Sequence, residues 1–442
     1  MALATPMTTS RPGLLVRLGL ALKNQRFQLV LLAVTGVPVT LGYAWTTFFR
    51  PWLFPGADVP DLYYTYLYSA GKLAAGLDPY STCVSPACWS DLTTAGSPYP
   101  PLVSWLFVPF VHLDRSLVGF GGLVVVQICI AIFIWTMSRG LRMNGWQSIA
   151  AASFAVMAFP PLIGEMVNRN IEVALLTLSG VWFAGYVIGD RWWSGCAVGA
   201  AIAIKVVQAP MLLLTLWRRQ LRAGVVAAAT FTLLWFLGAP QYLLEYLLKV
   251  APGLNTGTGS ALNVAPIATV ARLLHPGSMY GYETGADAIT RGIGYAITIV
   301  VVFLTIRALR SPLNDREGRV LEAAAIVAAT PLALAIVRPG HLSLDLLPIL
   351  VVGVTAVRAA DWRGLAAVAV SWTLMGPVYL WCSNVLALGM GLPYSRLGAE
   401  TAVLGALILW LSSLRALSRR AQLARTAAPI RTVGTAAPAL RT

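Results

Sequence analysis

Apolar runs about as long as a bilayer is thick recur along this chain, separated by short connections rich in Lys and Arg. A spanning helix needs ~20 predominantly apolar residues. The candidate runs are 27–48, 116–137, 147–163, 171–189, 222–239, 288–309, 319–337, 342–357, 364–382 and 399–416. Because 57% of the 442 residues are apolar and only 11% are charged, the sequence excludes a soluble domain of this size. We expect an all-α polytopic membrane protein with about 10–12 transmembrane helices.

The net charge of +15 indicates membrane sidedness rather than nucleic-acid binding. The basic residues do not gather on one polar domain but lie in short patches between apolar runs, which is the positive-inside pattern. This pattern places both termini in the cytoplasm. Because the segment Met1 to Arg26 is basic and lacks a cleavage-type ending, we expect no cleavable signal peptide.

One apolar stretch, 193–217, does not fit a simple alternation of sides. Arg191 before it and Arg218 after it both belong to connections assigned to the cytoplasm, and Lys205 and Pro210 interrupt it. We therefore expect two short helices that enter from the cytoplasm, turn near Lys205 to Pro210, and return. Broken helices at membrane depth are tolerated where they line a protein-filled or watery cavity.

The assignment of sides also gives the domain organisation. We expect a basic cytoplasmic segment over 1–26, a single transmembrane domain over 27–417, and a disordered cytoplasmic tail over 418–442. Two large outer loops interrupt the transmembrane domain, at 49–115 and 240–287.

Within the first outer loop, two helices are expected beside the membrane. A helix over 62–76 carries aromatic residues on several faces and is expected to lie at the interface. A second apolar helix over 102–112 would reverse the side of Arg139 and Arg142 if it spanned, so we expect it to be re-entrant or interfacial.

Asp61 is the strongest candidate for a catalytic group. It follows the first span in an acidic, aromatic-rich stretch, and a charge near hydrocarbon is costly unless it serves chemistry or recognition. We expect Asp61 to act as a general base for an acceptor hydroxyl. Asp58 can contact substrate or cap the following helix, and capping is favoured. Asp78 precedes Pro79 and is expected in a turn.

Aromatic and cysteine residues are concentrated in the same loop. Most of its tyrosines are expected in an interfacial belt and a few against sugar rings, with Tyr64 and Tyr66 as the candidates for substrate contact. Cys83 and Cys88 share one polar segment on the outer side. A disulfide between them stays an open alternative, and the lack of nearby histidines argues against a zinc site.

Basic residues in unusual places are candidates for binding an anionic group. Lys205 has no acidic neighbour in sequence, and we expect it either to snorkel or to bind a lipid phosphate. Arg338 and His341 join two spans on the outer side, where arginine departs from the positive-inside trend. They are expected to contact an anionic partner or outer-leaflet headgroups. Asp345 is expected to orient His341 or to pair with Arg338.

Polar residues between spans extend this candidate site. Asn168 and Asn170 lie in an outer connection together with Glu165, Arg169 and Glu172, and this polar group is expected to help line the active cavity. Asn170 opens a span and is expected to face inward; a satisfied loop with a helix cap is the alternative. Asn263, followed by Arg272 and His275, is a weaker indication of the same outer pocket.

The sequence contains no nucleotide-binding loop, metal-ligand cluster or Ser-His-Asp arrangement. We therefore expect neither a metal nor a cofactor, and a donor substrate that is already activated.

Several short motifs follow one another over about residues 55–345. They are Asp61-Leu62 with Tyr66 and Ala70, Gly76-Leu77-Asp78-Pro79-Tyr80, Tyr99-Pro100-Pro101-Leu102 with Pro109, Asn168 and Asn170, Trp192-Trp193-Ser194-Gly195 leading to Lys205, Pro210 and Arg218-Arg219, and finally Arg338 and His341. In this order and placement the chain resembles glycosyltransferase family 87 of the GT-C superfamily. It departs from the family at Tyr66, which lies five rather than four residues after the acid, and at Asn263-Val264-Ala265, which replaces an Asn-Gln/Ser-Ser type motif.

The resemblance implies a GT-C-like bundle and a membrane glycosyltransferase of cell-envelope synthesis. The implied donor is mannose or arabinofuranose linked to polyprenyl phosphate, and the implied acceptor is a glycolipid or polysaccharide. Asp61 would deprotonate the acceptor on the outer face of the membrane, and transfer would proceed with inversion. Lys205, Arg338 and His341 would stabilise the departing phosphate. Sugar, acceptor and linkage are not specified by the sequence.

Two other functions are alternatives. A secondary transporter or lipid flippase would favour paired repeats and ionisable groups at the midplane, whereas this chain concentrates polar residues in two asymmetric outer loops. A catalytically inactive, lipid-binding scaffold of the same fold would be unaffected by loss of the Asp61 carboxylate.

Overall fold

The computed structural model describes residues 25–54, 61–80, 97–143, 145–254, 262–275, 287–311, 313, 315–382 and 393–426. Within these residues every regular element is a helix and no strand occurs, which confirms the expected all-α class. Asp58, Cys83 and Cys88 lie outside the described residues.

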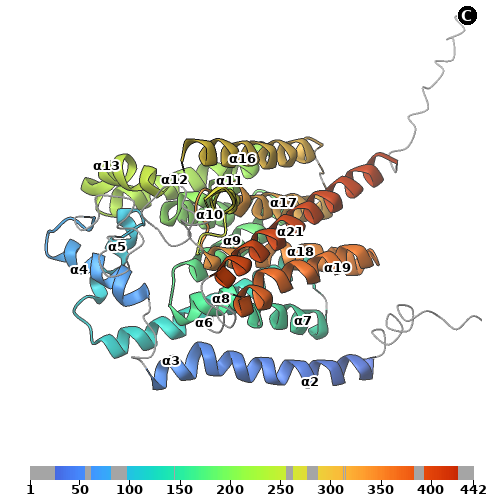
Figure 1. The fold of residues 1–442 in the computed structure, drawn as a ribbon, viewed down its shortest axis with the longest axis horizontal. Coiled ribbons are helices and arrows are strands. Elements are labelled where there is room, and N and C mark those ends of the chain that lie inside the picture. Colours follow the sequence, from blue (N-terminus) through green and yellow to red (C-terminus); the bar gives the residue numbers. More distant parts are fainter. Residues whose placement is uncertain are drawn as a thin grey trace, which may run out of the picture.

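Four helical segments in the described chain are long and apolar enough to cross a membrane (Figure 1). They are α6 (Arg115–Leu141), α16 (Ala288–Leu309), the continuous segment Pro339–Arg358 formed by η8 and α18, and Leu397–Thr426 within α21 (Pro393–Thr426). Two bent pairs raise the number to six if each is one span. These are Ser148–Met157 with Pro160–Val167, bent by 65°, and Leu221–Leu237 with Pro240–Val250, bent by 95°.

Shorter helices complete the bundle. The main ones are α2 (Gln25–Ala44), α9 (Glu172–Ile188), α10 (Trp192–Ile204), α11 (Ala209–Trp217), α17 (Arg316–Ala333) and α19 (Trp362–Thr373). Every predicted apolar run coincides with a helix or a bent pair, so the polytopic architecture is confirmed. The number of long spans is below the expected ten to twelve because several runs are short or bent.

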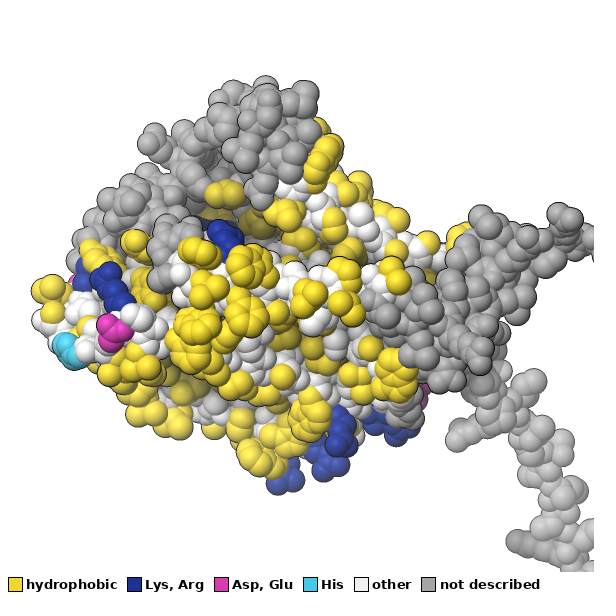
Figure 2. Space-filling view, turned by 90° about the horizontal axis from the view of Figure 1, so that it is seen from below, with side chains coloured by type: hydrophobic (Ala, Val, Ile, Leu, Met, Phe, Trp, Pro, Cys, Tyr) yellow, Lys and Arg dark blue, Asp and Glu magenta, His cyan; other side chains and the backbone are white. Residues whose placement is uncertain are grey.

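The core of the bundle is built around α9. Its side chains Trp182, Phe183 and Tyr186 are fully buried. By contrast, α16 has only 22% of its apolar window buried and exposes side chains such as Ile299. Figure 2 shows a broad hydrophobic surface with charged side chains gathered toward its ends. Such an outer surface is suited to contact with lipid chains.

The apolar stretch 193–217 is broken as the sequence predicts. Helix α10 ends at Ile204, Lys205 is extended, and a 3-10 turn leads into α11. After α11 the chain returns to the end of the bundle at which α10 begins. There the carboxylate of Asp190, which precedes α10, accepts from the backbone N–H of Ala223, which follows α11, at 2.8 Å. The hairpin is therefore confirmed, whereas its entry from the cytoplasm stays a prediction.

Two glycines let α10 pack closely against α12 (Leu221–Leu237). A Cβ atom at Gly195 would overlap the carbonyl oxygen of Ala223, and one at Gly199 would overlap that of Ala227. Small residues four apart permit such backbone contact between helices in membranes. This contact fixes the position of α10, and with it the position of Lys205.

The bundle has two distinct ends (Figure 1). The short helices α4 (Tyr68–Ala74), α5 (Pro101–Phe107) and α13 (Leu243–Glu245) lie at one end, which we call the loop end. The start of α2 and the end of α21 lie at the other, which we call the tail end. The predicted interfacial regions 62–76 and 102–112 are short helical segments at the loop end.

Candidate active site

Asp61 and Asn170 meet at the loop end although 109 residues separate them in sequence. Asp61 precedes η2 (Leu62–Leu67), a π-helical turn, and Asn170 lies just before α9. The backbone N–H of Leu62 donates to the carbonyl oxygen of Asn168 at 3.4 Å and joins the two segments. The Asn170 amide then donates to Asp61 Oδ2 at 2.5 Å. Asp61 is therefore held from a second segment of the chain.

Hydrogen bonds from the surrounding chain fix the orientation of the Asn170 amide. Its Oδ1 atom accepts from the backbone N–H of Glu172 and from the Tyr66 hydroxyl, both at 3.0 Å. Because a backbone N–H only donates, the amide oxygen faces it and the NH2 group faces Asp61. Tyr66 is fully buried, and its hydroxyl accepts from the backbone N–H of Ile171 at 3.1 Å. Tyr66 thus holds Asn170, which in turn holds the carboxylate.

Lys205 forms a second polar group with Glu172 and His341. Its ammonium donates to Glu172 Oε1, lies 2.7 Å from His341 Nε2, and lies 5.7 Å from the centre of the Tyr99 ring. The Glu172 side chain is 2% exposed and that of Lys205 21%. Lys205 has no acidic neighbour in sequence, but the start of α9 supplies one in space. The ion pair, rather than snorkelling, accounts for its position.

The imidazole of His341 faces more hydrogen-bond donors than it can satisfy. It lies in the 3-10 helix η8 (Pro339–Asp345), with Nδ1 3.2 Å from the backbone nitrogen of Arg338 and Nε2 facing Lys205. An ammonium and a backbone N–H only donate, whereas a neutral imidazole has one acceptor nitrogen. Glu172 Oε1 also lies 3.4 Å from Nε2, so an imidazole whose Nδ1 accepts from the Arg338 N–H can donate its Nε2–H to the carboxylate that pairs with Lys205.

The charge of the exposed Arg338 acts on Asp61. Burial raises the pKa of the Asp61 carboxyl above its ordinary value. The charge of Arg338 and the hydrogen bond from Asn170 lower the pKa, and Glu172 raises it. Because burial is the largest effect, the pKa stays raised, which favours a carboxylate that accepts a proton during reaction.

A close contact positions the connection that carries Arg338 and His341. A Cβ atom at Gly340 would overlap the side chain of Glu165 in α8 (Pro160–Val167), so only glycine allows this approach. Oε2 of Glu165 is buried and has no hydrogen-bond partner within the described residues. Glu165 therefore adds a third carboxyl group to those of Asp61 and Glu172 in this region.

The structure brings most of the predicted site residues together. Those that meet through side-chain contacts or electrostatic interaction are Asp61, Tyr66, Asn170, Lys205, Arg338 and His341. Asn168 contributes its backbone carbonyl oxygen. The Tyr64 side chain is 52% exposed, and its contact with substrate stays a prediction.

The side chains of Asn263, Arg272 and His275 form hydrogen bonds or ion pairs with other parts of the described chain. Asn263 Nδ2 donates to the carbonyl oxygen of Ala335 at 3.0 Å, and its Oδ1 accepts from the backbone N–H of Val337 at 2.9 Å. It supports the backbone that leads to Arg338. Fully buried Arg272 pairs with Glu400 of α21, and His275 pairs with Asp287. These contacts give the three side chains structural roles, and their part in an outer pocket stays a prediction.

Asp345 makes neither of the two contacts expected for it. It is buried, and neither carboxylate oxygen has a hydrogen-bond partner within the described residues. His341 Nδ1 instead faces the backbone of Arg338. Although Asp345 and His341 are about one helical turn apart, at the start of the segment that continues into α18 (Leu346–Arg358), no hydrogen bond joins their side chains.

Sequence reasoning placed Glu172 in a polar connection expected to line the site but did not identify it as the partner of Lys205. The available signal was an acidic residue at the opening of an otherwise apolar run, a costly position without a partner.

In the described part of the chain, no group of three or more His, Cys, Asp or Glu side chains is arranged to hold a metal ion.

Comparison with known proteins identifies relatives that are similar to this chain in sequence. Two similar proteins both bear the name polyprenol-phosphate-mannose-dependent alpha-(1-2)-phosphatidylinositol mannoside mannosyltransferase. The protein from Mycolicibacterium smegmatis is 26% identical over 322 residues, which cover 64% of this chain and 68% of the relative. The protein from Mycobacterium tuberculosis is 28% identical over 154 residues, covering 32% of this chain and 36% of the relative.

The sequence profile of glycosyltransferase family 87 matches residues 98–336, more than half of the chain. The matched segment includes Asn170, Glu172 and Lys205, begins after Asp61, and ends just before Arg338. By this match, the chain belongs to glycosyltransferase family 87.

Proposed function

We propose that this membrane glycosyltransferase moves mannose from polyprenyl-phosphate mannose to a hydroxyl of a mannosylated lipid on the outer face of the membrane. The observation that carries the proposal is the Asp61 carboxylate, held by Asn170 beside the cationic groups of Lys205 and Arg338. Membership of a glycosyltransferase family argues against the transporter or flippase alternative.

The arrangement of these groups supports the following reaction. The acceptor oxygen attacks the anomeric carbon of mannose while Asp61 takes the hydroxyl proton. The bond between the anomeric carbon and the phosphate oxygen breaks, and polyprenyl phosphate leaves with the bonding electrons, so the anomeric configuration inverts. Lys205, Arg338 and His341 donate hydrogen bonds or positive charge to the leaving phosphate, whose negative charge increases in the transition state.

Mannose is favoured over arabinofuranose by the relatives. Both are named for polyprenol-phosphate mannose as donor and for a phosphatidylinositol mannoside as acceptor. The outer location is supported by the charge pattern, because the loop end carries the two large loops and the tail end carries arginine-rich connections. Asp61 lies at the loop end.

The test compares two aspartates of the same loop. Membranes containing the wild-type protein, Asp61→Asn or Asp114→Asn are supplied with radiolabelled polyprenyl-phosphate mannose or arabinofuranose. Asp114 is an exposed residue that caps α6 through the backbone N–H groups of Ser116 and Leu117, and asparagine caps equally well. We expect mannose transfer to fall by about 10²–10⁴ in Asp61→Asn and to be unchanged in Asp114→Asn.

Retained transfer in Asp61→Asn would remove Asp61 from the mechanism. Transfer of arabinofuranose alone would keep the mechanism but overturn mannose as the sugar. Membrane insertion and thermal unfolding of each variant separate a catalytic defect from a folding defect.

A further inference from the structure

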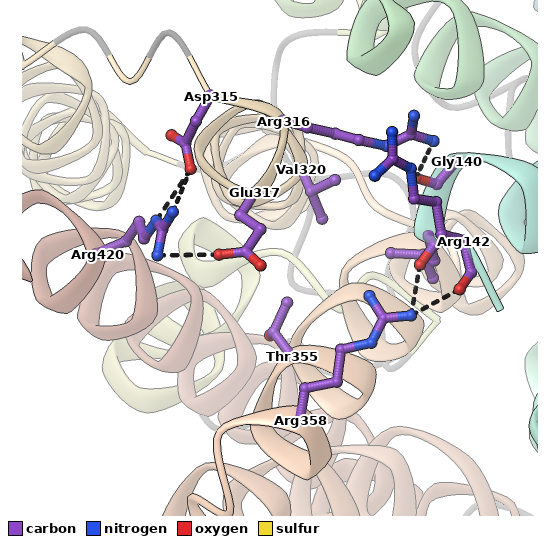
Figure 3. Close-up of a pocket in the computed structure, with 10 residues that line it drawn as sticks. Gly140, Arg142, Asp315, Arg316, Glu317, Val320, Thr355, Arg358 and Arg420 are labelled. Carbon is purple, nitrogen blue, oxygen red and sulfur yellow. Dashed lines mark hydrogen bonds and ion pairs between the residues drawn. The ribbon is translucent and has the colours of Figure 1, made fainter. Parts of the chain in front are cut away.

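At the tail end, four arginines border a cavity of about 290 Å³ that takes no part in the proposed reaction (Figure 3). Arg142 follows the last turn of α6, Arg316 begins α17, Arg358 ends α18 and Arg420 lies on α21. Asp315 and Glu317 are the acidic residues that line the same cavity. Residues from four separate helices therefore form one basic hollow.

Two of these arginines are held by the end of α6. Arg316 Nη2 donates to the carbonyl oxygens of Arg139 and Gly140 at 2.8 and 3.1 Å. Arg358 Nη2 donates to the carbonyl oxygens of Leu141 and Arg142 at 2.7 and 2.9 Å. The last carbonyls of a helix are unpaired and carry partial negative charge, so they attract guanidinium groups. A guanidinium has five N–H donors, and these contacts use one nitrogen of each.

The two acidic residues form ion pairs with an arginine on one side of the cavity only. Arg420 pairs with Asp315 at 2.5 Å and with Glu317 at 2.9 Å. Figure 3 places this group across the cavity from Arg142, Arg316 and Arg358.

Within the described residues, no ion pair joins Arg142, Arg316 or Arg358 to either carboxylate of the cavity. The pKa of Arg316 is lowered by desolvation and then by the charges of Arg142 and Arg358, as expected when like charges are crowded. Bringing an anion into this side of the cavity would relieve that repulsion.

The cavity lies among residues typical of a membrane interface. Trp135, Trp146 and Trp362 are more than half exposed and belong to the helix ends next to the cavity. Arg139 stacks over the ring of Trp135, 5.6 Å from its centre. Exposed tryptophans gather at the level of lipid headgroups, so the cavity is at the depth where a headgroup phosphate is available.

We propose that the cavity bordered by Arg142, Arg316 and Arg358 binds the phosphate group of an anionic phospholipid at the tail-end surface. Guanidinium groups match phosphate oxygens with paired hydrogen bonds, and three of them converge here from different helices. The bound headgroup connects α6, α17 and α18 and stabilises their packing.

Arg142 is the residue with which to test this site. The structure records no side-chain hydrogen bond or ion pair for it within the described residues, so its replacement removes charge without breaking a helix cap. Arg307 at the end of α16 is an exposed arginine at the same end of the bundle and outside the cavity, and it provides the matched control.

Full-length wild type, Arg142→Gln and Arg307→Gln are purified in neutral detergent and titrated with phosphatidylglycerol, phosphatidylcholine or inorganic phosphate. Bound ligand is counted by native mass spectrometry, and the melting temperature is recorded in parallel. We expect phosphatidylglycerol to bind wild type and Arg307→Gln and to raise their melting temperature. Its affinity should fall about tenfold in Arg142→Gln, the loss expected for one charge-assisted hydrogen bond.

Equal losses in Arg142→Gln and Arg307→Gln, or equal binding of phosphatidylcholine, would overturn the site in favour of diffuse surface charge. Inorganic phosphate that reproduces both the stabilisation and its dependence on Arg142 would overturn the lipid as the source of the phosphate. If Arg142→Gln does not fold in lipid-free detergent, Arg142→Lys keeps the charge and removes the paired donors. Wild-type affinity in Arg142→Lys would then overturn the proposed phosphate contact.

Discussion

The loop end and the tail end hold their charged residues in different ways. At the loop end, partly buried Lys205 is paired with buried Glu172, and Asp61 is held by Asn170. At the tail end, Arg316 and Arg358 are held by backbone carbonyls of α6 and border an open cavity. A charge inside the bundle requires an opposite charge, whereas a charge at its edge is sufficiently stabilised by a helix end and water.

Removing one partner of the Glu172–Lys205 ion pair gives the largest expected loss of stability. Glu172→Gln leaves the Lys205 ammonium without its carboxylate in a largely buried position. The loss of a buried partner typically costs about 3–5 kcal/mol, so we expect a strongly lowered melting temperature in detergent. Lys205→Met in the same background should recover part of the loss, because it removes the unpaired charge. No recovery in the double variant would show that Glu172 stabilises the fold by other contacts.

Asn170→Ala separates positioning from folding. Without the amide, Asp61 loses the hydrogen bond that orients it, and we expect transfer to fall by about 10²-fold. Because this hydrogen bond lowers the pKa of Asp61, its loss raises that pKa and moves the acidic limb of the kcat/KM profile to higher pH. Asp114→Asn is the control, since Asp114 is an exposed helix cap outside the candidate site. An equal defect in both variants would contradict the assigned role.

Arg338→Gln tests the electrostatic coupling at the loop end. The charge of Arg338 lowers the pKa of Asp61, so its removal raises the pKa further above the ordinary value. The base is then ionised only at higher pH, and activity should decline earlier as the pH falls. We also expect the KM for the donor to rise more than that for the acceptor, by roughly tenfold. Arg115→Gln, which replaces an exposed arginine at the start of α6, should leave both quantities unchanged.

The smallest change is expected at the tail end. Glu317→Gln removes one carboxylate from Arg420, which keeps Asp315 as a partner. The Glu317 side chain is 63% exposed, and exposed ion pairs contribute about 0–1 kcal/mol. A melting temperature close to that of wild type would sharpen the contrast with Glu172→Gln. A loss as large as that of Glu172→Gln would remove the distinction between the two ends.

Much of the fold followed from the sequence, because apolar length and helix breaks are local properties. The break at Lys205 was predictable from the arginines on both sides of 193–217, and the structure confirms the return of the chain. Asp61, Tyr66 and Asn170 were named as site residues, and the structure joins them through hydrogen bonds.

The remainder of the site depended on side-chain directions that the sequence does not specify. Asp345 lies close to His341 in sequence, yet it has no hydrogen-bond partner in the described chain. Asn263 had the residue type of a ligand-binding group, yet its amide satisfies backbone groups around Ala335 and Val337. Proximity and residue type alone therefore do not specify which contacts these side chains make.

The sequence by itself determined that this is a helical membrane protein with polar loops between its apolar runs, because hydropathy and charge act over neighbouring residues. Only the tertiary structure decided that Glu172 neutralises Lys205, that Asn170 orients Asp61, and that arginines from separate helices converge at the tail end. These pairs come from distant segments, and the desolvation of a charge is compensated only by groups that helix packing brings within a few ångströms.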